Sequence, residues 1–300
     1  MTDTRYFIRA ALAAAVLPLG LAAQQGARVD TTLSLDRGGL VQLGAVSGEI
    51  RVSASERSDV RITATMERGR FELSATPGRI GLTTRSVNQR QSSAYIDVQV
   101  PIGTRVSAST VSGLVEVRGT QAEVSARSVS GRVDVRGVRE RLDVETVSGT
   151  VDLRDVEGRM NVEGVSADID VERAVGDLTS ETVSGSIRIR RSDLTGLRAE
   201  AVSGTISYDG NLSPSGAYRM NTHSGSITMT LPAGVGARLE LETFSGRISS
   251  DFPLTLQPGQ STGRGKRMEF TLGSGGARVT AGASSGNVTI RRAGTKDNRE

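Results

Sequence analysis

The sequence has no cysteine and no tryptophan, and aromatic residues make up only 3% of its 300 residues. Without cysteine, the chain has neither a disulfide framework nor a lipid-modified cysteine. Without many aromatic side chains, a hydrophobic core must consist of Val, Ile, Leu and Ala. Such small side chains suit thin stacked layers better than a thick globular interior.

Lysine and histidine are also scarce. Lys266 and Lys296 are the only lysines and His223 is the only histidine, so the net charge of +4 comes almost wholly from arginine. Asp and Glu are interleaved with these arginines, which is typical of a solvated surface rather than a nucleic-acid footprint. Because no aromatic residues alternate with the basic ones, we expect no nucleic-acid partner.

Residues 1–23 have the pattern of a signal peptide. Arg5 and Arg9 precede an apolar run over 10–23, which is too short to span a bilayer comfortably. We expect cleavage after Ala23, with an uncleaved anchor as the alternative. The mature chain would then have no transmembrane segment, and it would be exported to the periplasm, the cell surface or the medium.

A short repeat dominates the remaining sequence. The phrase Thr-Val-Ser-Gly or Ser-Val-Ser-Gly ends at Gly113, Gly131, Gly149 and Gly185, and the first three are 18 residues apart. A degenerate copy, Gly164-Val-Ser-Ala167, continues the spacing. A fixed short period predicts stacked units, each of which buries its apolar face against the next. Period-two alternation on either side of each Ser-Gly pair predicts two short strands joined by a tight turn.

Aligned on the Ser-Gly pair, the coils have three apolar columns that we expect inside. One column lies six residues before the serine (Val106, Val124, Leu142, Met160, Leu178, Leu197, Tyr218, Leu239, Val279). The second lies directly before the serine (Val111, Val129, Val147, Val165, Val183, Val202, His223, Phe244, Ser284). The third lies two residues after the glycine (Val115, Val133, Val151, Ile169, Ile187, Ile206, Ile227, Ile248, Val288).

These patterns predict an all-β, single-chain β-solenoid, similar to a parallel β-helix, with coils of 18–21 residues and an irregular N-terminal β-segment. The expected division is a signal peptide over 1–23, the N-terminal segment with a first coil over 24–105, repeats over 106–292 and a disordered tail over 293–300. If the corners use a positive φ, Ala167 is strained there and Ala167→Gly should stabilise the fold.

Charged residues form further columns on the expected outer face. An acidic row (Glu116, Asp134, Asp152, Asp170) runs beside an arginine row (Arg118, Arg136, Arg154), and a second acidic row contains Glu145, Glu163, Glu181 and Glu200. Calcium binding and the paired carboxylates of a glycosidase are two functional readings of the first row. Because arginines flank it, we favour a solvated, self-neutralising ladder, and we predict no metal, cofactor or catalytic residue.

Two further features have a functional and a structural reading. His223 could be catalytic or bind a metal, but we interpret it as a substitution in an apolar core column. Arginines and one lysine could contact anionic envelope polymers or lipid headgroups, but we favour the interpretation that they are edge-protecting surface charge. They are Arg188, Arg190, Arg191, Arg264, Lys266 and Arg267.

The Val-Ser-Gly turns, the entry Val100-Pro-Ile-Gly103 and its echo Leu231-Pro-Ala-Gly234 together resemble a bacterial family of adhesin-like proteins of unknown function. The resemblance implies a β-solenoid and an envelope location, and it implies no catalytic residues. We therefore predict a non-enzymatic envelope binding or scaffold module that contacts a polysaccharide, a membrane surface or another envelope protein. A carbohydrate-active enzyme and an envelope-stress accessory protein are the alternatives.

Overall fold

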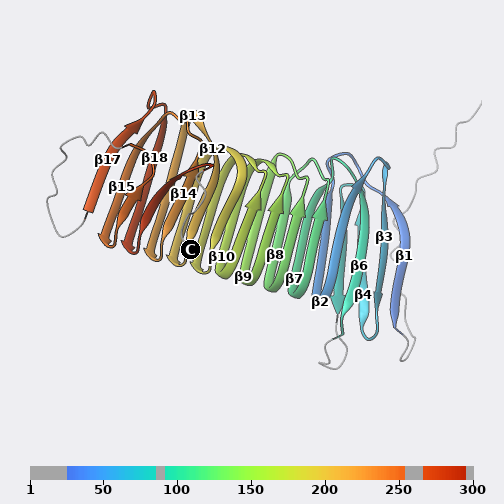
Figure 1. The fold of residues 1–300 in the computed structure, drawn as a ribbon. Coiled ribbons are helices and arrows are strands. Elements are labelled where there is room, and N and C mark those ends of the chain that lie inside the picture. The colour runs from blue at the N-terminus through green and yellow to red at the C-terminus, as the bar shows by residue number, and fades with distance from the viewer. Residues whose placement is uncertain (1–25, 86–91, 254–265, 295–300) are drawn as a thin grey trace, which may run out of the picture.

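The structure is a computed structural model that describes residues 26–85, 92–253 and 266–294. The described chain is all-β, with nineteen strands joined in one sheet that is mostly parallel (Figure 1). This confirms the predicted β-solenoid. In these residues no helix has the length and apolar character needed to cross a membrane. The expected signal peptide and residues 295–300 of the expected tail lie outside the described residues.

The strands are β1 Ala27–Ser34, β2 Leu40–Ser55, β3 Asp59–Met66, β4 Arg70–Thr76, β5 Arg79–Arg85, β6 Ala94–Pro101, β7 Arg105–Arg118, β8 Val124–Arg136, β9 Arg141–Arg154, β10 Glu157–Glu172, β11 Val175–Ser184, β12 Ile187–Ser203, β13 Ile206–Ser224, β14 Ile227–Leu231, β15 Ala237–Ser245, β16 Ile248–Ser250, β17 Lys266–Leu272, β18 Ala277–Ser285 and β19 Val288–Arg292.

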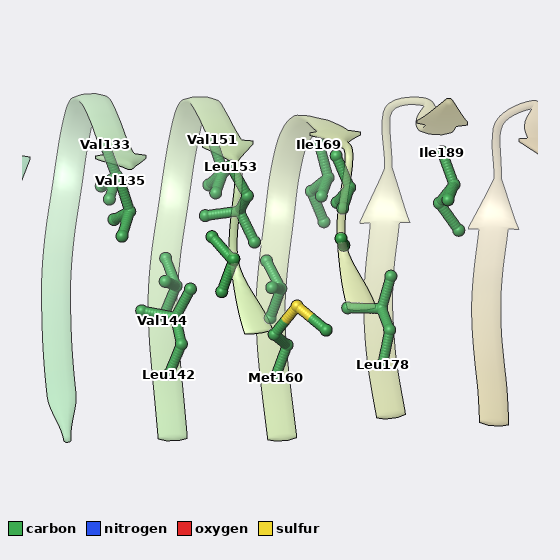
Figure 2. Close-up of a cluster of buried hydrophobic side chains, with 14 of the residues drawn as sticks. Val133, Val135, Leu142, Val144, Val151, Leu153, Met160, Ile169, Leu178 and Ile189 are labelled. Carbon is green, nitrogen blue, oxygen red and sulfur yellow. The ribbon is translucent and has the colours of Figure 1, made fainter. Parts of the chain in front are cut away.

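Each central coil is a bent ribbon with two arms that face one another. In β9 the first arm carries Leu142 and Val144 and the second carries Val151 and Leu153, and all four are fully buried between the arms (Figure 2). The coils stack in register, so Leu142 pairs with Val124 on one side and Met160 on the other. Similar apolar side chains of successive coils therefore lie about 4.8 Å apart, which is the strand spacing, and together they form a narrow continuous core.

The Ser-Gly corner requires glycine for two reasons. Gly149 has a φ of 124°, and a Cβ at this position would lie 1.8 Å from the carbonyl oxygen of Gly131 in the preceding coil. L-residues rarely adopt this conformation, and the close stacking of corners leaves no room for a side chain. The recurrent glycine therefore permits both the bend and the close stacking of the corners.

The corner at Ala167 is built differently, so the prediction that Ala167 is strained is wrong. Ala167 does not have a positive φ, and its side chain is buried. The coil has Gly164 where its neighbours have Thr146 and Thr182, and a Cβ on Gly164 would lie only 2.7 Å from the Ala167 Cβ. The alanine methyl group thus uses space that the missing threonine side chain leaves free.

The stack does not follow chain order at its two ends (Figure 1). At the N-terminal end, β2 pairs with β7 on one side and with β5 and β6 on the other. Strands β3, β1 and β4 then add antiparallel pairings beyond this layer. At the C-terminal end, β18 lies between β13 and β15, although it comes after β15 in the sequence. Strand β17 closes this end by pairing antiparallel to β15.

Candidate functional site

One of the three columns predicted to be interior lies on the surface instead. The valines directly before the corner serine are about half exposed: Val147, Val165 and Val183 are each 48% exposed, and Phe244 is 62% exposed. The threonine one position earlier, such as Thr146, points inward and is buried. The prediction for this column was therefore wrong, whereas the column six residues before the serine is buried throughout. The column two residues after the glycine is also buried, except for the half-buried Ile248.

The buried threonines hold the corner by hydrogen bonds to the main chain. Thr146 Oγ1 donates to the carbonyl oxygen of Ser148 at 3.3 Å, and Thr182 Oγ1 donates to that of Ser184 at 3.1 Å. The main chain bends at the valine that lies between this threonine and the serine, for example at Val147. This valine is skipped in the strand pairing. The valine side chain is exposed at this bend, and with the two residues before it, it lines a hollow in the surface.

These hollows line up from coil to coil and form a groove with a volume of about 1160 Å³. It extends from Ala45 in β2 to Phe244 in β15, across ten stacked coils. At about 4.8 Å per coil the groove is roughly 43 Å long. We name two rows of its lining residues. The valine wall consists of Val111, Val129, Val147, Val165, Val183 and Val202, and the glutamate wall consists of Glu145, Glu163, Glu181 and Glu200.

The glutamate wall is only partly neutralised. Arg127 donates two hydrogen bonds to Glu145, at 3.0 and 3.1 Å, and these hold the pKa of the Glu145 carboxyl below its usual value. Arg198 lies 3.0 Å from Glu200 and 3.5 Å from Glu181. Among the described residues, Glu163 has a hydrogen bond from Asn161 at 2.9 Å but no ion pair. The wall therefore keeps a net negative charge.

The other acidic row lies on the second arm of the coils, away from the groove. Asp134 is buried beneath Arg136, whose guanidinium group donates two hydrogen bonds of 2.8 Å to the carboxylate. Asp152 lies 2.7 Å from Arg132 and 3.4 Å from Arg154. Arginine thus covers these carboxylates, and in the described part of the chain no cluster of three or more acidic or histidine side chains could hold a metal ion.

The basic residues that we considered for anionic ligands are largely engaged within the fold. Arg188 and Arg190 lie 3.6 and 3.5 Å from Asp170, and Arg191 forms an ion pair with Glu172. Lys266 donates to the carbonyl oxygen of Gly246, and Arg267 pairs with Glu240 and Glu269. Arg264 lies outside the described residues. These contacts favour the surface-charge reading of the cluster.

His223 lies in the groove rather than in the core. It is exposed and occupies the position of the valines in its coil, so the interpretation of a core substitution was wrong. The sequence pattern does not reveal the groove, because its valine wall is apolar and apolar residues are expected in the interior. Strand phase could have shown that the valines face outward, because Val147 is an odd number of positions from the inward-facing Leu142 and Val144.

Comparisons with known proteins give a family but no established function. No curated protein matches the chain. A solved structure of a "putative cell adhesion protein" from Clostridium sporogenes is similar over 88% of this chain and 99% of its own, with 9% identity and a TM-score of 0.23. That score is too low to support an argument. The Toastrack DUF4097 model matches residues 83–214 and 181–291, which together cover more than half of the sequence. The chain is therefore a member of the Toastrack DUF4097 family.

Proposed function

We propose that the protein is a non-enzymatic binding module of the cell envelope that holds an elongated ligand along the groove. The groove supports this proposal because it repeats the same two side chains, a valine and a glutamate, over several consecutive coils. A site of this kind favours a long ligand that makes many equivalent contacts. The basic and apolar pattern of residues 1–23 supports export, and we propose that the mature chain acts outside the cytoplasm.

A carbohydrate-active enzyme is the competing function, since adjacent glutamates on the wall are about one strand spacing apart. Glycosidases place their two carboxyl groups on either side of the scissile bond, with one kept protonated by a raised pKa. Here the glutamates form a single row with one carboxylate per coil, and a valine follows two positions later on each strand. The pKa of Glu145 is also shifted downward. The geometry therefore supports binding better than hydrolysis.

The absence of native cysteine allows a direct test of the groove. We would introduce Val165→Cys, which lies in the groove, and couple a bulky maleimide to it. Val175→Cys is the matched control, because Val175 is 45% exposed, similar to Val165 at 48%, but does not line the groove. The unlabelled full chain should sediment with an envelope preparation. Labelling at 165 should abolish sedimentation, and labelling at 175 should not.

Equal sedimentation of both labelled variants would contradict a role for the groove. Cleavage of envelope glycans by the purified protein, lost in Glu163→Gln, would favour the enzyme instead.

A further inference from the structure

The two walls of the groove differ in chemistry, and this difference restricts the ligand. A single exposed valine on a protein surface is ordinary, but an unbroken row of them is typical of an interaction site. The row includes Val129, Val147, Val165 and Val183, all between 47% and 48% exposed. A ligand that covers this wall must therefore present an apolar edge along its length.

The glutamate wall requires positive charge. Glu145, Glu163, Glu181 and Glu200 follow one another in adjacent coils, paired in register. Like charges at this spacing repel one another. Among the described residues, only Arg127 and Arg198 form ion pairs with this wall: Arg127 pairs with Glu145, and Arg198 pairs with both Glu181 and Glu200. A cationic ligand would relieve the remaining repulsion, whereas an anionic ligand would increase it.

The main chain of the groove is not free to bind the ligand. The strands run across the groove, and their amide and carbonyl groups are already paired along the stack, for example between β9 and β10 and between β10 and β11. A ligand that lies along the groove therefore cannot add to the sheet as another strand. Its side chains must make the contacts.

The repeat spacing favours a helical ligand. An α-helix advances 5.4 Å per turn, which is close to the coil spacing of about 4.8 Å. Over the three intervals from Glu145 to Glu200 the two repeats diverge by only about 2 Å, which long Lys and Arg side chains can absorb. An extended strand repeats the same face about every 7 Å and loses register within two coils.

We propose that the groove receives a cationic amphipathic α-helix from a partner polypeptide. Its apolar face contacts the valine wall, and Lys or Arg side chains along one flank contact the glutamate wall. Amphipathic helices bind hydrophobic grooves in the same way in other systems. This inference rests on the function proposed above, since it names the ligand class of the same groove.

The test uses the full chain and a labelled peptide of about 21 residues, or six helical turns, made of Leu and Lys at amphipathic spacing. Fluorescence anisotropy should show saturable binding, and circular dichroism should show that the bound peptide is helical. Two control peptides define the chemistry. One has Glu in place of every Lys, and the other has the same composition in an order without helical periodicity; neither should bind measurably.

Two sets of variants assign the binding to the walls. The first removes three charges from the glutamate wall (Glu163→Gln, Glu181→Gln, Glu200→Gln), and its control removes three exposed charges elsewhere (Glu56→Gln, Glu67→Gln, Glu157→Gln). The first should weaken binding about tenfold and reduce its salt dependence, while the control should stay within about twofold. The second replaces the valine wall with an isosteric polar residue (Val147→Thr, Val165→Thr, Val183→Thr) and should also weaken binding about tenfold.

Binding of the Glu-containing peptide, or equal loss of affinity in the two glutamine triples, would overturn the inference. A failure of the helix proposal can be distinguished from a failure of the proposed function. If labelling at Val165→Cys blocks sedimentation with the envelope but the cationic helix does not bind, the groove is a binding site for another class of ligand. If labelling has no effect and the helix does not bind, both proposals fail.

Discussion

At the scale of single residues, the coil around Gly164 and Ala167 shows how two positions compensate for each other. Its neighbours have a threonine that bonds to the corner and a glycine at the corner itself, as at Thr146 and Gly149. In this coil, Gly164 takes the place of the threonine and Ala167 takes the place of the corner glycine. Because a Cβ on Gly164 would lie 2.7 Å from the Ala167 Cβ, the two local arrangements exclude one another.

This exclusion predicts strong non-additivity between Gly164→Thr and Ala167→Gly. Gly164→Thr alone should destabilise the protein by about 1–3 kcal/mol, because the new side chain overlaps the Ala167 methyl group. Ala167→Gly alone should cost about 1 kcal/mol, through the lost methyl group and a freer unfolded chain. The double variant recreates the pattern of the adjacent coils and should be more stable than the sum of the single effects by at least about 1 kcal/mol.

Urea unfolding of the four proteins gives the coupling free energy directly. Gly103→Ala is a suitable control, since a Cβ at Gly103 would meet no atom within 4 Å. Additive effects at 164 and 167 would show that the two coil types do not exclude each other.

At the scale of the coil, strand phase predicts more than hydrophobicity does. Leu142, Val144 and Thr146 alternate on one face, and all three are buried. Val147 follows Thr146 and belongs to the other face, but its apolar character suggested the interior. The sequence therefore predicts the coil, its two arms and its corner, whereas the groove depends on the bend at the valine. That bend is fixed by a threonine-to-carbonyl hydrogen bond, which apolar periodicity does not report.

The order of coils is the second feature that the sequence does not determine. Coils 237–250 and 277–292 have the same columns, so either could stack on β13 by side-chain chemistry alone. In the structure β18 occupies that place, and β15 stacks on β18. In a stacked repeat each coil depends on its immediate neighbours. The last coil in the sequence should therefore hold the preceding coil in place.

A chain that ends at Gly276 tests this dependence. Without β18 and β19, strand β15 loses its parallel partner, so its amides should lose protection from hydrogen exchange, as should those of β17. Protection in β7–β10 should be unchanged, because these coils are several layers away. Hydrogen exchange followed by mass spectrometry measures both ends in one experiment. Retained protection in β15 would mean that it stacks directly on β13 instead.

At the scale of the whole molecule, ion pairs join neighbouring coils on the outer surface. Arg173 bonds to Asp155 of the preceding coil at 2.6 and 2.8 Å, and Arg127 bonds to Glu145 of the next coil. These hydrogen bonds lower the pKa values of both carboxyl groups. Both carboxylates are about half exposed, so each pair contributes little by itself and is weakened by salt.

The direction of these pKa shifts predicts how stability depends on pH. A carboxyl group whose pKa is lower in the folded state stabilises the fold above its unfolded pKa of about 4, and this contribution is lost as the pH falls through the folded value. The free energy of unfolding should therefore be nearly constant between about pH 7 and 5 and should fall below about pH 4.

Asp155→Asn should lose stability at neutral pH and show a shallower decline in acid. Glu56→Gln should change neither, because Glu56 has no ion pair among the described residues. Urea unfolding at a series of pH values measures both quantities, and a rise in stability below about pH 4 would show that repulsion along the acidic rows outweighs the ion pairs.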